Sequence, residues 1–535
     1  MLHFRRVRGR RWGAVRMATV ETPTIPASRA DRFLNAVERV GNRLPDPVAI
    51  FVIMIGVLVA ASVIGSGLGW SSIHPVTGEV LEAKSLLSEP LVRQFLSEMP
   101  RTYTGFAPLG LVLVLILGAG VAEQAGLFSA LLRKVMGGVP EYLLSPAVIL
   151  FGMLASHASD ASFLIMVPLA GMLFANAGRN PLQGIVLGFA GCCTGLAGNL
   201  MPGQYDVLIF GITEAGAQLL VPDWRMNPLG NWWFMIAIAV ANVSLGWLVA
   251  VKVVGPRLPV WQREMAVVPT MTGELTAAER RGLRAAGLVA LLGAAVVAGL
   301  IVWPGYAPLY DYAAEPDERM RPFFGSIAGI LFLLFLFTGW AYGKAAGTIS
   351  GHRQVIEMMG NGLMPMLPYL VLVFFAAHFV AMFGWSNLGP ITAINGANFL
   401  RELGTPPALM LPILTTASAW LDFLIASGSA KWTAMAPVVV PMLMLLDISP
   451  EMTTAAYRVG DTVTNLISPL NPYFALTLMF CQRWVPGMRL GTLLAATLPL
   501  AIAFYIAGMA ITAGWVALDI PPGPGAEVSY TLPVR

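Results

Sequence analysis

Residues 417–437 read ASAWLDFLIASGSAKWTAMAP and place a polar run, SGSAK at 427–431, inside the otherwise apolar stretch 407–446. A second apolar stretch, 142–174, holds the comparable run SHASD at 156–160. A helix of about 20 residues crosses a bilayer, so each stretch is long enough for two arms. Non-helical backbone at membrane depth is tolerated only where it is buried in protein or lines a cavity. We therefore expect each polar run to be the tip of a re-entrant hairpin.

The composition excludes a soluble or a disordered protein. Of 535 residues, 56% are hydrophobic and 12% are charged, whereas roughly 25% are charged in a typical soluble domain. The mean hydropathy is +0.71. The 3 cysteines, two of them adjacent at Cys192 and Cys193, form no disulfide framework. An all-α polytopic membrane protein is predicted, with 39 prolines and 55 glycines available to interrupt its helices.

The distribution of basic residues predicts the topology. The first 43 residues carry 10 arginines and no acid before Glu21, which favours a cytoplasmic N-terminus. Following the apolar segments between the basic loops gives about nine spans in addition to the two hairpins. On this path the C-terminus is periplasmic, and the protein is expected in a bacterial inner membrane.

The two hairpin regions resemble each other in order and spacing. The motifs DASF at 160–163 and SAKW at 429–432 are 269 residues apart, and so are Pro168 and Pro437. Each hairpin is followed by a span with an Asn-Leu pair and a proline. Because the first hairpin enters from the cytoplasm and the second from outside, the chain is expected to contain an inverted-topology repeat, as secondary transporters often do.

The predicted organisation follows the repeat. A basic cytoplasmic segment, 1–45, precedes a first repeat, 46–255, with a hairpin at about 142–178 and a broken helix at about 182–220. A cytoplasmic linker, 256–284, leads to a second half, 285–518, with a hairpin at about 407–447 and a broken helix at about 453–480. A tail, 519–535, ends the chain.

Broken helices near the midplane suggest a carrier. Their amino ends offer amide donors to a carboxylate, and unwound carbonyls or side-chain oxygens can hold Na⁺, while an acid can carry a proton. We expect H⁺ or Na⁺ as the coupling ion, no cofactor and no firmly assigned metal. No Gly-Lys-Ser/Thr phosphate loop occurs, which argues against ATP drive. The hairpin-tip residues that form a candidate cation site are Ser159, Asp160, Asn199, Ser427 and Asn465.

Several ionisable residues lie in apolar segments, where each is costly. Asp206 follows a break and should face the cavity, and Asp422 lies on the first arm of the second hairpin. Arg458 and Asp461 are three residues apart on one helix face and can pair. Either they form a structural ion pair, or the arginine holds a substrate carboxylate while the aspartate relays a proton. Trp432 either stacks on an aromatic substrate or packs in the core.

The sequence resembles the AbgT family of transporters from about Glu38 to the C-terminus. The motifs are ERVGNRLP at 38–45, YTGFAPLG at 103–110, SDA at 159–161, GRNPL at 178–182, SAKW at 429–432, AAYRVGD at 455–461 and PPGPGA at 521–526. The resemblance implies a bowl-shaped homodimer with nine transmembrane helices and two opposed hairpins per protomer. It also implies uptake of p-aminobenzoyl-glutamate or export of sulfonamide antimetabolites, which share an aniline ring. Positions tied to substrate passage in the family fall on Asp206, Trp432, Pro450, Arg458, Asp461, Ser429 and Pro469.

The sequence also departs from the family at the predicted cavity. The family usually has an asparagine where this chain has Asp422, and its Gly-Thr-(Ile/Leu)-Asp-Pro-Leu-Leu motif reads GQYDVLI at 203–209. An additional carboxylate at Asp422 disfavours an anionic ligand unless it is protonated or binds a cation.

Three other functions stay open at this stage. A Na⁺-coupled dicarboxylate carrier would have Ser-Asn-Thr at its tips, where this chain has Ser159-Asp160-Ala161 and Ser429-Ala430-Lys431. An intramembrane hydrolase needs a nucleophile with a base or a metal set; only 5 histidines occur and no His-Glu-x-x-His pattern. A channel would need no saturable site. We therefore expect a carrier and no enzyme, with an aromatic carboxylate or sulfonamide and the lipid bilayer as partners and no nucleic acid.

Overall fold

The protein is almost entirely helical in the part that the structure describes. The computed structural model describes residues 47–75, 78–136, 139–259, 261, 275–303, 305–314, 319–423, 425, 427–468 and 471–532. The strands among them are the short antiparallel pair β1 (Ser71–Ile73) and β2 (Val80–Glu82). The predicted all-α class is confirmed, whereas the basic segment 1–45 lies outside the described residues.

Six helical segments among the described residues are long and apolar enough to cross a membrane, with 19 to 28 residues each. They correspond to α2 (Pro47–Gly67), α10 (Trp232–Val249) with the residues that continue it, α11 (Ala277–Val302), α13 (Ile327–Ala346), α15 (Leu367–Trp385) and α21 (Leu490–Ala517). At 1.5 Å per residue, about 20 residues span the roughly 30 Å hydrocarbon core. Shorter apolar helices accompany them, and the count of nine spans stays a prediction.

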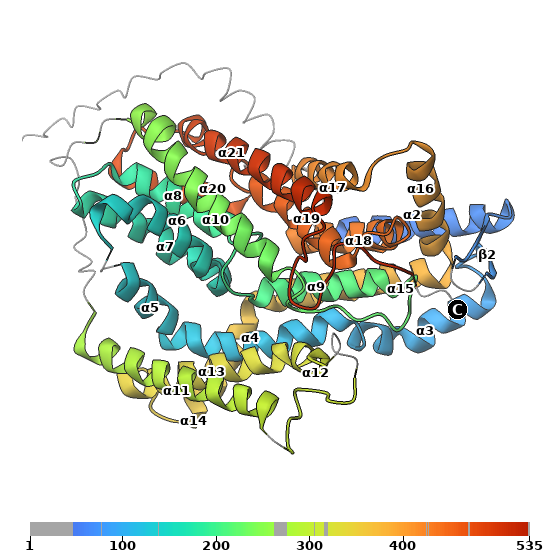
Figure 1. The fold of residues 1–535 in the computed structure, drawn as a ribbon, viewed down its shortest axis with the longest axis horizontal. Helices are drawn as coiled ribbons and strands as arrows, with labels where there is room; N and C mark the ends of the chain where they lie inside the picture. The colour runs from blue at the N-terminus through green and yellow to red at the C-terminus, as the bar shows by residue number, and fades with distance from the viewer. Residues whose placement is uncertain are drawn as a thin grey trace, which may run out of the picture.

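The helices α4 (Ala107–Ala125), α11, α13 and α14 (His352–Leu363) pack into a layer of their own, seen along the lower side of Figure 1. Small residues bring the backbones close together. A Cβ atom on Gly118 of α4 would lie 2.4 Å from the carbonyl oxygen of Phe332 on α13, and one on Gly120 would lie 2.9 Å from Gly362 of α14. Such contacts are typical of helices that associate in lipid, where close approach replaces the hydrophobic effect.

The other helices and short helical segments outside the two hairpin regions have the following bounds. They are α3 (Glu89–Thr104), α5 (Leu127–Met136), α12 (Arg321–Gly325), α16 (Leu388–Glu402) and the short helical segments η1 (Glu141–Leu143), η3 (Ala250–Val254), η4 (Gly255–Arg257) and η6 (Met364–Met366).

Both regions predicted as hairpins are pairs of helices joined by a short turn. In the first, α6 (Leu144–Ala155) and η2 (Ser156–Ala158) lead to α7 (Ser159–Asn176); in the second, α17 (Pro407–Leu421) leads to α18 (Gly428–Met444). Each pair is followed by two short helices with a break between them. These are α8 (Pro181–Thr194) and α9 (Gln204–Ala217), and α19 (Pro450–Thr464) and α20 (Pro472–Trp484). Entry and exit of each pair on the same membrane side stays a prediction.

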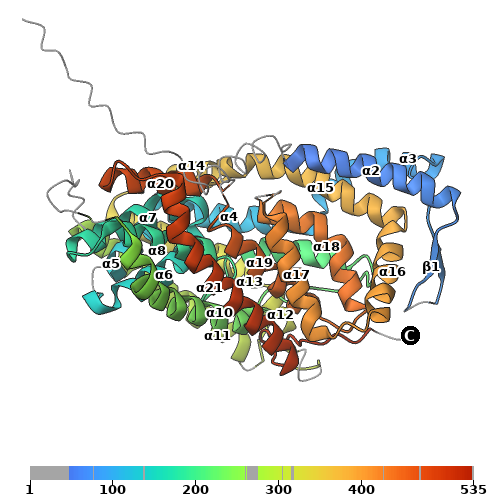
Figure 2. The ribbon, with the colours of Figure 1, turned by 90° about the horizontal axis from the view of Figure 1, so that it is seen from above.

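The packing of the two hairpins follows one pattern. In the first half, α6 and α7 contact α8, and α7 also contacts α20 from the other half. In the second half, α17 and α18 contact α19, and α18 contacts α9 from the first half. Figure 2 places α19 between α17 on one side and α6, α7 and α8 on the other. Each hairpin therefore rests on the broken helices of both halves.

Candidate functional site

The break between α8 and α9 places Asp206 at a helix amino end. Gly203 is the residue before α9, and Asp206 lies in its first turn. The Gly203 amide donates to Oδ2 of Asp206 at 2.5 Å. A carboxylate in this position satisfies an amide that has no partner within the helix and interacts favourably with the helix dipole. Asp206 is buried, so its other oxygen requires a charged partner.

That partner is Arg458 on α19. Its Nη2 lies 2.6 Å from Oδ1 of Asp206, and its Nε donates to the carbonyl oxygen of Leu196 at 2.9 Å. Leu196 lies two residues beyond the end of α8 at Thr194, in the turn that begins the break. The buried guanidinium therefore joins the carboxyl end of α8 to the amino end of α9, and it holds the break from the opposite half of the chain.

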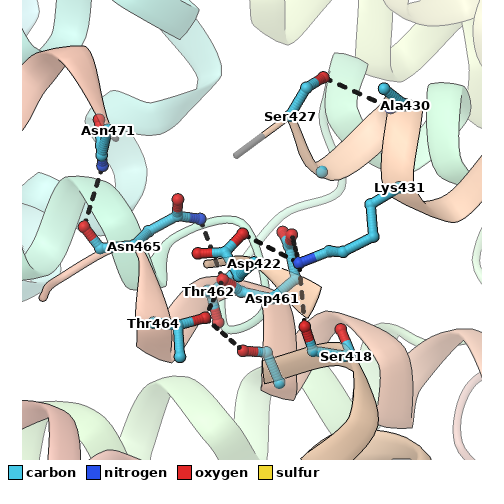
Figure 3. A network of polar contacts seen from close by, with 12 residues as sticks. Ser418, Asp422, Ser427, Ala430, Lys431, Asp461, Thr462, Thr464, Asn465 and Asn471 are labelled. Carbon is cyan, nitrogen blue, oxygen red and sulfur yellow. Dashed lines mark hydrogen bonds and ion pairs between the residues drawn. The ribbon is translucent and has the colours of Figure 1, made fainter. Parts of the chain in front are cut away.

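A second charged cluster lies at the turn of the second hairpin (Figure 3). Nζ of Lys431 lies 2.9 Å from Oδ1 of Asp422 and 2.9 Å from Oδ1 of Asp461. It also donates to the carbonyl oxygen of Ser418 at 3.2 Å. Asp422, Lys431 and Asp461 each have a relative exposure of 0%. Burial of ions is tolerated when they are paired and hydrogen-bonded.

Aromatic side chains surround these charges. The hydroxyl of Tyr205 donates to Oδ2 of Asp461 at 3.1 Å, and the Tyr205 ring lies 5.8 Å from the Arg458 guanidinium carbon. Tyr457 donates its hydroxyl to the carbonyl oxygen of Gly428. Gly428 has no room for a side chain, because a Cβ atom there would lie 2.5 Å from the Tyr205 hydroxyl. The tip of the second hairpin thus packs directly on the residues of both charged groups.

A small cavity opens beside the Arg458–Asp206 pair. Its volume is about 10 Å³, and its lining includes Ser156, His157 and Asn199 of the first half together with Tyr205, Asp206 and Arg458. A volume of this size holds about one water molecule. A substrate with an aromatic ring can therefore enter only after side chains or helices move apart.

The predicted pairing of Arg458 with Asp461 is wrong in this structure. Arg458 pairs with Asp206 and Asp461 pairs with Lys431. The spacing of three residues brings the two backbones together on α19, but each side chain reaches a different helix. The buried cation of the second hairpin is a nearer partner for Asp461, and the break in α8–α9 offers Arg458 both a carboxylate and a free carbonyl.

Trp432 packs in the interior. Its relative exposure is 0%, its ring stacks on Tyr457 with 4.3 Å between centroids, and its Nε1 donates to Thr213 at 2.9 Å. Of the two predicted roles, packing is the one present in this structure. The indole still lies one residue from Lys431, so it supports the position of the cluster.

The other predicted site residues lie around the two breaks and the second turn. Asn199 donates to the carbonyl oxygen of Met153 at 2.7 Å and so ties the first break to α6. Ser427 accepts from the Ala430 amide at 3.4 Å and caps α18, with the Ser429 hydroxyl 3.4 Å from its own. Asn465 donates to the carbonyl oxygen of Asp461 at 3.0 Å.

Four predicted site residues remain: Pro450, Pro469, Ser159 and Asp160. Pro450 begins α19 and lies away from the charged groups, eight residues before Arg458 in the chain. Pro469 and the side chains of Ser159 and Asp160 lie outside the described residues. A cation site at the first tip therefore stays a prediction.

Lys431, Tyr205 and Tyr457 belong to the site but are absent from the predicted site residues. Lys431 could have been predicted from the sequence, because a lysine in an apolar segment requires an acidic residue close by. Tyr205 and Tyr457 could not have been predicted, because phenol rings are common in apolar helices and the partners of their hydroxyl groups are distant in the sequence. Within the described ranges, no group of three or more His, Cys, Asp or Glu side chains is placed to hold a metal ion.

Comparisons with known proteins show the family to which the chain belongs. Residues 32–530 match the family described as "AbgT putative transporter family". The p-aminobenzoyl-glutamate transport protein of Escherichia coli (strain K12) is 34% identical over 503 residues, which are 94% of this chain and 98% of that protein.

Two solved structures share the fold. The Alcanivorax borkumensis YdaH transporter is 36% identical, with a TM-score of 0.83 over 90% of this chain and 100% of its own. Neisseria gonorrhoeae MtrF, which is described with a class of antimetabolite efflux pumps, is 36% identical, with a TM-score of 0.85 over 92% and 100%. The match covers both hairpin regions, both breaks and the buried charged groups, and the chain belongs to the AbgT family of membrane transporters.

Proposed function

We propose that this protein is a secondary active carrier for small aromatic acids of the p-aminobenzoyl-glutamate type, with export of sulfonamide antimetabolites as the related activity. An H⁺ or Na⁺ gradient drives it. Two relatives support the substrate class: one is named for p-aminobenzoyl-glutamate transport and the other is described among antimetabolite efflux pumps. We further propose an inner-membrane homodimer with a cytoplasmic N-terminus and a periplasmic C-terminus.

The observation that carries the proposal is the buried guanidinium of Arg458 at a cavity lined by both halves. Rings of Tyr205 and Phe210 flank it, at 5.8 and 5.9 Å from the guanidinium carbon. Arginine binds a carboxylate through a fork of donors, and flanking aromatic rings suit an aniline or benzoyl group. A ligand with a ring and a carboxylate, or with a ring and a sulfonyl group, matches this chemistry.

Substrate binding then competes with Asp206. Because Asp206 already occupies the guanidinium at 2.6 Å, a substrate carboxylate takes over part of that interaction when the cavity widens. The exchange keeps the arginine paired throughout, which avoids the cost of an isolated buried charge. Widening separates α9 from α19, the helices that hold the two partners.

Transport by purified protein in liposomes tests the proposal. Labelled p-aminobenzoyl-glutamate and a labelled sulfonamide are offered separately, with a pH gradient or a Na⁺ gradient imposed in parallel samples. We expect saturable, gradient-driven movement of at least one of them. Movement that is unaffected by either gradient, or that never saturates, would contradict an active carrier.

Two substitutions address the site directly. Arg458→Ala leaves Asp206 buried without its cation, and Asp461→Ala leaves Lys431 with one carboxylate instead of two. We expect both variants to insert into the membrane and to lose transport. Arg225→Ala serves as the control, since its ion pair with Glu214 is largely exposed on the arginine side. If either site variant keeps full activity, the substrate binds elsewhere in the protein and the proposed site is wrong.

A further inference from the structure

The cluster of Asp422, Lys431 and Asp461 does not balance in charge. It contains two carboxylates and one ammonium, all with 0% exposure, so with every group ionised it carries one surplus negative charge. The neighbouring buried pair, Arg458 and Asp206, is balanced by itself and supplies no compensation. An uncompensated charge in a buried site is costly, and such a group takes up a proton instead.

The other titratable groups facing Asp422 add no positive charge. They are Tyr457 on α19, Tyr205 on α9 and Cys193 on α8. Phenols and thiols are either neutral or negatively charged, so ionisation of any of them would increase the surplus negative charge of the cluster. The described residues around the cluster therefore leave a proton as the neutralising group.

The hydrogen bonds indicate which carboxylate holds the proton. An ammonium group has three donors, and Nζ of Lys431 already has three oxygens within 3.2 Å. Both oxygens of Asp461 are occupied, one by Lys431 and one by the Tyr205 hydroxyl. Oδ2 of Asp422 is the oxygen left over: it is buried and has no hydrogen-bond partner within the described part of the chain.

The Thr464 hydroxyl lies beside the Asp422 carboxyl group. It donates its own hydrogen to the Gly460 carbonyl oxygen at 3.1 Å, which leaves its lone pairs free to accept. A proton on Asp422 would remove the surplus negative charge, and the Thr464 hydroxyl beside the carboxyl group has a lone pair available to accept it. Lys431, fixed to α18, fills the oxygen-lined position between the carboxylates that a free monovalent cation would otherwise take.

We propose that Asp422 carries one exchangeable proton and that Lys431 is its fixed counter-ion, so that H⁺ rather than Na⁺ couples transport in this protein. The proton leaves when opening exposes Asp422 to water on one side, and it returns before the cluster is buried again. The coupling part rests on the proposed carrier function, whereas proton binding by Asp422 does not.

Infrared difference spectroscopy of the purified full-length protein tests proton binding without any substrate. We expect the carbonyl band of a protonated carboxylic acid at neutral pH, its loss at alkaline pH, and its absence from Asp422→Asn. Asparagine keeps the shape and can still accept from Lys431. Asp447→Asn is the control: Asp447 is exposed and its backbone has φ 59°, a conformation asparagine tolerates. A band that persists in Asp422→Asn would overturn the assignment.

Thermal stability in matched NaCl, KCl and choline chloride tests the exclusion of Na⁺. The unmodified protein should melt at the same temperature in all three. Lys431→Met removes the ammonium between the carboxylates, and we expect this variant to gain stabilisation from NaCl over choline chloride. Specific stabilisation of the unmodified protein by NaCl would show an independent Na⁺ site and overturn the proposal.

Proton movement in liposomes tests the coupling. If the carrier function holds, Asp422→Asn should lose the uptake of labelled p-aminobenzoyl-glutamate that a pH gradient drives, whereas the exposed control Asp447→Asn should keep it. Retained pH-driven uptake in Asp422→Asn would refute the coupling role of Asp422. Absence of all transport in the unmodified protein would refute the carrier function instead, while the infrared result would still stand.

Discussion

Tyr205 connects the two buried charged groups of the site. It directly precedes Asp206, the partner of Arg458, and its hydroxyl donates to Asp461, the partner of Lys431. Its ring also lies over the Arg458 guanidinium at 5.8 Å. A movement of α9 that changes the Asp206–Arg458 pair therefore changes a hydrogen bond to the Lys431 cluster at the same time, which gives substrate binding and ion release a common residue.

Tyr205→Phe tests this connection, because it keeps the ring and removes the hydroxyl. A hydrogen bond to a charged group contributes about 1.5–3 kcal/mol, so we expect gradient-driven transport to fall about 10- to 100-fold. Binding that depends on the ring should change much less. Tyr312→Phe is the control, since Tyr312 is 62% exposed. If the Tyr205→Phe variant transports at the normal rate, the Tyr205 hydroxyl does not couple the two charged groups.

At the scale of elements, the breaks in the helices could be predicted and the contacts across them could not. The Asn199-Leu200 pair and Pro202 predicted an interruption within 182–220, and α8 ends at Thr194 while α9 begins at Gln204. Proline and glycine act on the backbone locally, so their effect can be inferred from neighbouring residues. The pairing of Arg458 with Asp206 depends on how two distant segments meet, and the spacing within α19 favoured Asp461 instead.

Gly460 shows how closely the second hairpin packs on α19. A Cβ atom there would lie 2.1 Å from the carbonyl oxygen of Thr415 and 3.0 Å from the Ser418 side chain, both on α17. The closeness also supports the hydrogen bonds from Thr415 and Ser418 to carbonyl oxygens of Ala456 and Tyr457. Asp461 is the next residue, so the packing of α17 sets the position of the cluster.

Gly460→Ala should therefore force α17 away from α19. Overpacking of this kind costs about 1–3 kcal/mol, and we expect a lower melting temperature together with a marked loss of transport. Gly360→Ala in α14 is the matched control, because a Cβ atom there meets nothing within 4 Å. Equal stability and equal activity of the two variants would contradict the tight contact between α17 and α19.

At the scale of the whole molecule, the C-terminal tail ties the two halves together. In the second half, the Ser449 amide donates to the carbonyl oxygen of Val528 at 2.9 Å, next to the start of α19. In the first half, the Phe234 amide donates to the carbonyl oxygen of Pro522 at 3.0 Å, and the Asn227 side chain donates to that of Pro524 at 2.6 Å. The tail thus links the loop before α10 to the helix that carries Arg458.

Gly523→Ala tests whether this link stabilises the molecule. A Cβ atom at Gly523 would lie 2.0 Å from the Leu229 carbonyl oxygen and 2.6 Å from the Gly230 carbonyl carbon, and neither backbone atom can rotate away as a side chain would. We expect the tail to detach from the first half and the melting temperature of the purified protein to fall by a few degrees. Gly514→Ala in α21 meets nothing within 4 Å and should melt like the unmodified protein. If the two variants melt alike, the tail follows the surface without joining the halves; if Gly523→Ala alone is destabilised, the tail contributes to holding the start of α19 against the loop before α10.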